Sequence, residues 1–113
     1  MAKSTILDQS KKFTKKDMIN SRNATAAQDM GKETFKLSAC AVLEKEDEDG
    51  EPKTVGVLVT NQGTFTTISS SIVDTIYELI DLETDGDELD SMEYKIEKKK
   101  SKGGRDFLTM TIL

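Results

Sequence analysis

Several stretches of the chain alternate hydrophobic and polar residues, which is the pattern of half-buried β-strands. The first stretch covers residues 34–44 and places one set of apolar residues on a common face: Phe35, Leu37, Ala39, Ala41 and Leu43. A turn of Asp/Gly/Pro type at 47–52 leads to a second expected strand over 54–60. A tight turn at 61–63 then leads to a third strand over 64–68. Three β elements are therefore expected to form a meander.

After residue 68 the hydrophobic period changes from two residues to about 3.6. Serines at 69–71 provide a cap for apolar residues that recur three and four positions apart: Ile72, Val73, Ile76, Tyr77, Leu79 and Ile80. This pattern predicts an amphipathic helix of about three turns, which ends at residues 84–87.

Residues 91–113 predict a β-hairpin that turns at Gly103-Gly104. One face of its first strand carries Met92, Tyr94 and Ile96, and the return strand matches it with Leu108, Met110 and Ile112. Side chains alternate across a strand. The outward face of the return strand is therefore expected to carry Arg105, Phe107, Thr109 and Thr111.

The expected order is β-β-β-α-β-β, an α+β fold that is mostly β. Five antiparallel strands with one helix before the fourth are compatible with an OB-like, partly open barrel or with another small α+β sheet. Residues 1–13 are polar and rich in lysine, so we expect a flexible basic N-terminal arm. A single domain over 14–113 follows, and Thr14–Asp17 has the capping-box spacing that begins a short helical turn.

Composition narrows the possible chemistry. The chain has 113 residues and no histidine, which removes the commonest general base and metal ligand. We therefore expect no catalytic site, no cofactor and no metal site. The acidic runs 47–50 and 85–90 lack the ligand frame of an EF-hand loop. The single cysteine, Cys40, is expected to be a buried, unreactive thiol.

The sequence also predicts the cellular compartment of the protein. No apolar stretch approaches the roughly 20 residues that span a bilayer, and the N-terminus has no apolar signal core. We therefore expect a cytoplasmic protein that does not enter a membrane.

Charge is segregated along the chain, whose net charge is −5. Residues 44–51 hold six acidic residues against Lys45, and residues 74–93 hold acidic residues with no basic one. The basic residues gather instead at the final hairpin: Lys95, Lys98, Lys99, Lys100, Lys102 and Arg105. A basic patch on an acidic protein favours contact with a phosphate backbone.

Phe107 adds a second signal beside these cations. Cations that follow phosphates and an aromatic ring that stacks on a base, for about 1–3 kcal/mol, are typical of single-stranded nucleic-acid binding. Phe65 and Phe35 would join it if the sheet places them on the same exposed face. In the structural alternative, Phe107 covers a barrel end or the N-terminal segment, and the lysines keep an edge hairpin soluble.

Residues 101–113, together with 63–70 and the turn at 44–50, resemble the small single-stranded DNA-binding proteins of tailed bacteriophages. In that family a Gly-flanked basic turn leads into a closing strand with an arginine and an aromatic residue. A Gly-aromatic-Thr-x-Ser turn enters the helix. The resemblance spans roughly residues 14–113. It implies non-catalytic, sequence-independent binding of single-stranded DNA in phage DNA replication or recombination.

The chain departs from many such proteins at its end. They carry a mobile acidic tail that recruits replication partners, whereas this chain stops at Ile112-Leu113 inside the last strand. Recruitment of replication or recombination proteins would then use the acidic segments 44–51 or 81–93. Exposed strand edges are compatible with a homodimer, which the sequence does not decide.

A second hypothesis comes from another class of function. A small acidic phage protein could mimic DNA with the carboxylates of 44–51 and 74–93, and so bind and inhibit a host protein. Such a protein would be indifferent to oligonucleotides, which separates it from the first hypothesis.

Overall fold

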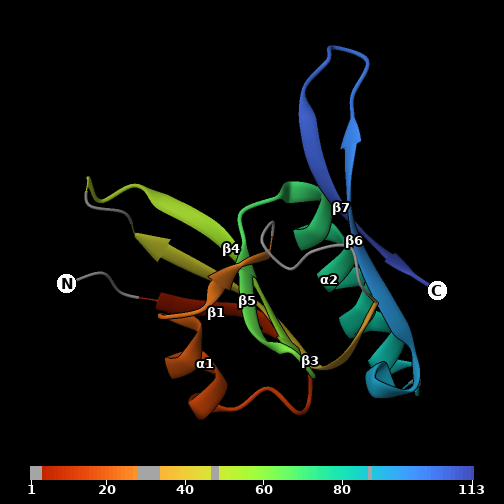
Figure 1. Cartoon of the computed structure of the whole chain (residues 1–113). Helices are drawn as coiled ribbons and strands as arrows, with labels where there is room; N and C mark the ends of the chain where they lie inside the picture. The colour runs from red at the N-terminus through yellow and green to blue at the C-terminus, as the bar shows by residue number, and fades with distance from the viewer. Residues whose placement is uncertain (1–3, 28–33, 47–48, 87) are drawn as a thin grey trace.

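The computed structural model describes residues 4–27, 34–46, 49–86 and 88–113, and these form one curled sheet with helices packed against it (Figure 1). In chain order the elements are β1 (Ser4–Gln9), α1 (Lys15–Ser21), β2 (Thr25–Ala26), β3 (Phe35–Glu46), β4 (Pro52–Thr60), β5 (Gly63–Thr67), α2 (Ser70–Thr84), the 3-10 helix η2 (Leu89–Ser91), β6 (Glu93–Lys100) and β7 (Asp106–Ile112).

The sheet has the strand order β2-β5-β4-β3-β6-β7, with β1 paired to β3. The short β2–β5 pair is parallel, and the other described pairs are antiparallel. β3 is twelve residues long and pairs with β4 over most of its length. The sheet curls into an open half-barrel, which confirms the predicted OB-like α+β class. The predicted β-β-β-α-β-β order corresponds to β3, β4, β5, α2, β6 and β7.

The N-terminal segment belongs to the sheet. β1 pairs with β3, and Ser10 continues the contact: its N–H donates to the Cys40 carbonyl at 2.9 Å, and its Oγ accepts from the Cys40 N–H at 3.0 Å. Phe13 is buried beyond it. The prediction of a flexible arm is therefore wrong from Ser4 onward. Backbone pairing with β3 and burial of the Phe13 ring hold the segment against the sheet, although it is rich in lysine. Residues 1–3 lie outside the described residues.

A β-bulge in β3 corrects a second prediction. The register with β4 shifts between Leu37 and Ala39. One extra residue in a strand moves every later side chain to the opposite face. The core against α2 therefore contains Phe35 and Leu37 before the shift but Cys40 and Val42 after it, and the other face receives Ala39, Ala41 and Leu43. The prediction that residues 35–43 share one apolar face is thus wrong.

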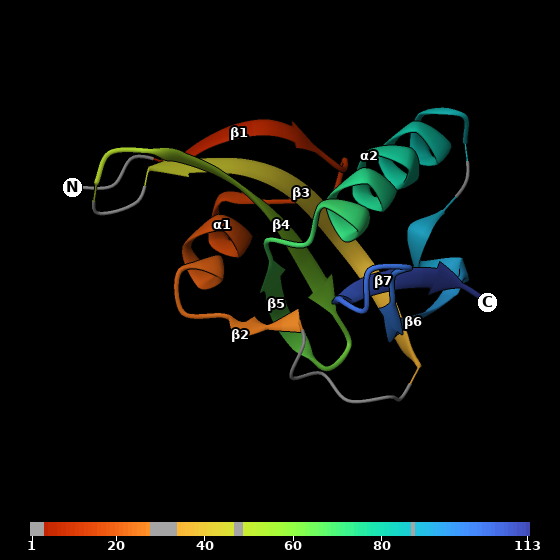
Figure 2. The ribbon, with the colours of Figure 1, turned by 90° about the horizontal axis from the view of Figure 1, so that it is seen from above.

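Both helices begin at the predicted caps. Thr14 and Asp17 form the reciprocal capping box of α1, and the Ser69 side chain caps α2. Figure 2 shows α1 and α2 on opposite sides of β3 and β4, so the strands are buried on both faces. Gly56 in β4 lets α2 approach, since a Cβ there would lie 2.7 Å from Ile76 Cδ1. In the described part of the chain, no helix is long and apolar enough to cross a membrane.

Candidate nucleic-acid interface

The predicted hairpin is present and extends away from the rest of the sheet (Figure 1). β6 and β7 pair in the expected register, with Ile96 opposite Met110. The turn at 101–105 is closed by two backbone hydrogen bonds of 2.9 Å, from the Ser101 N–H to the Arg105 carbonyl and from the Gly104 N–H to the Ser101 carbonyl. Gly104 has a φ of +80°, which favours glycine. The tip is therefore an ordered loop that carries exposed cations.

The cations of the hairpin are divided between its two faces. Residues directly opposite each other in an antiparallel pair place their side chains on the same face. Lys99 lies opposite Phe107, and Lys98 lies opposite Leu108. Lys99 and Phe107 thus share the outer face, where Phe107 is 38% exposed, as predicted. Lys98 lies on the face that carries the core residues of β6. The predicted cations consequently lie on both faces of the hairpin, while Phe107 and Lys98 both line the groove described below.

Two of the predicted aromatic companions are buried. Phe35 is 2% exposed and stacks on Tyr94, with ring centroids 5.8 Å apart and an interplanar angle of 25°. Phe65 is 9% exposed in β5 and lies opposite Leu58 of β4. The expectation that either ring shares an exposed face with Phe107 is therefore wrong, because both rings are enclosed by neighbouring strands and core side chains.

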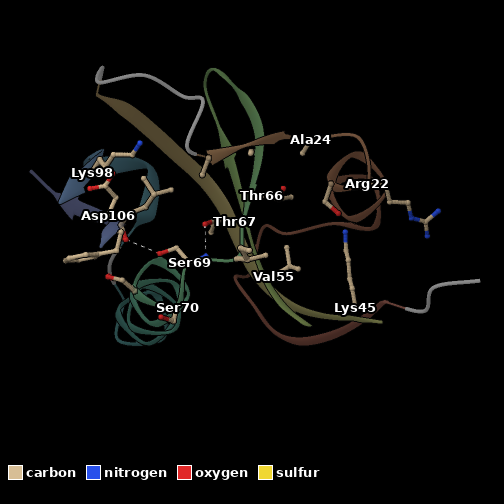
Figure 3. A pocket seen from close by; sticks show the side chains of 17 residues that line it. Arg22, Ala24, Lys45, Val55, Thr66, Thr67, Ser69, Ser70, Lys98 and Asp106 are labelled. Carbon is tan, nitrogen blue, oxygen red and sulfur yellow. Dashed lines mark hydrogen bonds between the residues drawn. The ribbon is translucent and has the colours of Figure 1, made fainter. Parts of the chain in front are cut away.

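A groove of about 890 Å³ lies beside the hairpin (Figure 3). Its lining combines β4 and β5, the segment around β2, the end of β3, the start of α2 and the end of α1. The hairpin contributes Lys98, Asp106, Phe107 and Leu108. Figure 3 shows Lys98 and Asp106 at one side, Val55, Thr66 and Thr67 between, and Arg22 and Lys45 at the opposite side. The groove is therefore flanked by cations from three distant parts of the chain.

The chemistry of the groove suits a phosphate backbone. Its described lining residues include three cations, Arg22, Lys45 and Lys98, against one carboxylate, Asp106. Serine and threonine side chains supply hydroxyl donors along the wall. The N-terminus of α2 also opens here, and its partial positive charge favours anions. Together these groups can hold a flexible polyanion without reading its bases.

Sequence reasoning missed Arg22 and Lys45. Lys45 stands inside an acidic run, and Arg22 lies between Ser21 and Asn23 with no cation next to it in the sequence. Both residues line the groove that Lys98 also lines, because β3 and α1 end at the side of the groove opposite Lys98. No local pattern marks either residue, since the signal is a tertiary contact.

Neither Cys40 nor the Lys12–Asp90 ion pair lines the groove. Burial raises the pKa of the Cys40 thiol to about 12, and the nearby Glu83 carboxylate adds to the effect. Cys40 is therefore an inert core residue, as predicted. Lys12 pairs with Asp90 at 3.2 Å, on η2 and away from the groove. Within the described ranges, no three side chains of metal-binding type come together.

Comparison with known proteins identifies the family. The family model of phage single-stranded DNA-binding protein, of the phi29 type, matches residues 13–113. No curated protein and no solved structure gives a significant match. The matched region begins at the buried Phe13 and includes the hairpin and every residue that lines the groove. The chain therefore belongs to the phage single-stranded DNA-binding protein family, and its function is to bind single-stranded DNA.

Proposed function

We propose that the single strand lies in the groove, with its phosphates held by Lys98 at one end and by Arg22 and Lys45 at the other. The observation that carries this proposal is the convergence of these cations in a protein of net charge −5. A local positive surface on an acidic protein attracts a polyanion there and repels it elsewhere. This arrangement supports the groove as the first contact of the strand.

The hairpin extends the path beyond the groove. Phe107 lines the edge of the groove and offers its ring for stacking on a base, and Lys95 and Lys99 lie on the same face of the hairpin. Further cations at the end of β6 and in the turn follow the phosphates: Lys100, Lys102 and Arg105. Phosphate contacts and stacking on a ring face depend little on base identity. Sequence-independent, non-catalytic binding is the function that these groups support.

This activity fits a role in phage DNA replication or recombination within the host cytoplasm, where exposed single strands need protection. Acidic side chains of α2, such as Asp74, Glu78 and Asp81, lie outside the groove lining. The use of the acidic segments 44–51 or 81–93 by protein partners stays a prediction, as does a homodimer.

The salt dependence of binding tests the placement of the strand. Each phosphate contact to a single strand contributes about 0.7 to the slope of log affinity against log salt. Lys98→Gln and Arg22→Gln should each weaken binding of a fluorescent oligo-dT and reduce that slope by about 0.7. Fluorescence anisotropy at several salt concentrations measures both quantities.

Lys16→Gln is the matched control, because Lys16 is an exposed residue of α1 outside the groove lining. It should leave the slope unchanged. If the groove variants behave like Lys16→Gln while the protein still binds oligo-dT, the strand does not occupy the groove.

A further inference from the structure

Ile68 is the most exposed large hydrophobic residue in the described part of the chain, at 75%. It lies in the lining of the groove, between the end of β5 and the start of α2. Single exposed hydrophobic residues are common on protein surfaces, so exposure alone assigns no role. The backbone around Ile68 and the charges that flank it supply the argument.

The backbone on both sides of Ile68 is fixed. Thr67 is the last residue of β5 and pairs with Gly56 of β4, and its Oγ1 accepts a hydrogen bond from the Ser69 N–H at 3.0 Å. Ser69 Oγ donates to the Leu108 carbonyl at 3.0 Å. A β-branched side chain also has few rotamers. The backbone of Ile68 is therefore held in place before any ligand binds, which lowers the entropic cost of a contact with its side chain.

The charges around Ile68 define where a bound strand would place its parts. The cations lie toward the sides of the groove, at Lys98 and at Arg22 with Lys45 (Figure 3). Phosphates held there leave the bases to the surface between, which is formed by Ile68, Val55 and small side chains. Nucleobases have apolar faces, and proteins contact them with isoleucine as well as with aromatic rings.

We propose that Ile68 is a base-contacting residue of the groove, whose side chain packs against a nucleobase while the flanking cations hold the phosphates. This inference rests on the proposed placement of DNA in the groove. An apolar contact has no hydrogen-bond pattern to match, so it accepts different bases. Ile68 thereby adds affinity without adding sequence preference.

Substitution of Ile68 tests the contact. Ile68→Ala should lower the affinity for oligo-dT about five- to tenfold, as expected for loss of a largely buried aliphatic contact. The thermal midpoint should stay unchanged, because Ile68 is exposed in the free protein. Ile19→Ala is the matched control: Ile19 is 58% exposed on α1 and lies outside the groove lining. It should bind like the unmodified protein.

An abasic strand separates contact with bases from contact with the backbone. The unmodified protein and Ile68→Ala should bind an abasic oligonucleotide of the same length with equal affinity. If Ile68→Ala lowered the affinity for the abasic oligonucleotide as much as the affinity for oligo-dT, Ile68 would contact the sugar-phosphate chain. That result would overturn the inference.

A fluorescent probe gives an independent measurement. The chain has no tryptophan, so Ile68→Trp introduces a single indole whose emission should be quenched by oligo-dT, whereas that of Ile19→Trp should not. Lack of quenching, or full affinity in Ile68→Ala, overturns the role of Ile68. If Arg22→Gln and Lys98→Gln still weaken binding, the groove itself stands; if they too have no effect, both proposals are wrong.

Discussion

A DNA-binding role and a packing role require opposite degrees of exposure of the Phe107 side chain. It is partly exposed on the outer face of the hairpin, opposite Lys99. A ring that stacks on DNA needs that exposure, whereas a ring that closes the end of a core would be buried. In the proposed complex the neighbouring cations hold a phosphate backbone close to the ring, so stacking would follow from attraction to the hairpin.

Phe107→Leu keeps an apolar side chain but removes the aromatic face. The affinity for oligo-dT should fall roughly five- to hundredfold, because stacking contributes about 1–3 kcal/mol per base. Stability should change by about 0.5 kcal/mol or less, as for most exposed substitutions. Anisotropy and urea unfolding of the same preparation measure the two effects. A large loss of stability with unchanged affinity would support the packing role instead.

At the scale of elements, α2 packs against the β6–β7 hairpin in one hydrophobic core, and a single side chain adds a hydrogen-bonded link between them. Ser69 caps α2 by accepting from the Ile72 N–H at 3.5 Å and donates to the Leu108 carbonyl of β7. β7 also pairs with β6, and its Met110 packs in the core beside α2. The cap therefore helps to fix the angle of the hairpin relative to the groove.

Ser69→Ala should lower the free energy of unfolding by about 1–2 kcal/mol, through loss of the cap and of one hydrogen bond. Ser70→Ala is the control, since Ser70 is exposed at the first position of the same helix. Urea denaturation compares the two variants. Equal stability of the two variants would contradict a stabilising role for the hydrogen bonds of Ser69.

At the scale of the whole molecule, two acidic groups are enclosed in the same core beneath α2. Burial raises the pKa of Cys40 from 9.0 to about 12 and that of Tyr94 from 10.0 to about 12, and neighbouring negative charges add to both shifts. Tyr94 also donates its hydroxyl to the Leu89 carbonyl at 2.9 Å. The folded protein therefore disfavours both anions.

Stability should fall in alkaline solution for this reason. A raised pKa in the folded state contributes stability below the unfolded pKa, and this contribution is lost as pH rises from about 9 toward 12. Each group can reduce the free energy of unfolding by up to about 1.4 kcal/mol per pH unit in that window. Urea midpoints at pH 8 and pH 10.5 measure the decline.

Cys40→Ala should make the decline shallower between pH 9 and 10, where the unfolded thiol ionises first. An unchanged midpoint in the unmodified protein between pH 8 and pH 10.5 would contradict the burial of these groups.

The sequence alone determined the elements and the composition of the hairpin. Periods of two and 3.6 residues, serine caps and the Gly-Gly turn are local signals, so β3, β4, β5, α2, β6 and β7 could be predicted. Phe107 and the cations beside it followed from alternation along one strand. These features depend on residues close in sequence, where backbone geometry fixes which side chains share a face.

Tertiary structure decided the faces and the groove. The bulge near Ser38 moved half of β3 to the opposite face, pairing with β3 placed β1 in the sheet, and packing enclosed Phe35 and Phe65. Arg22, Lys45 and Ile68 line the same groove as Lys98 because separate elements end around one concavity. Such contacts arise from the register and curvature of the sheet, which no local pattern specifies, so they became visible only once the chain was folded.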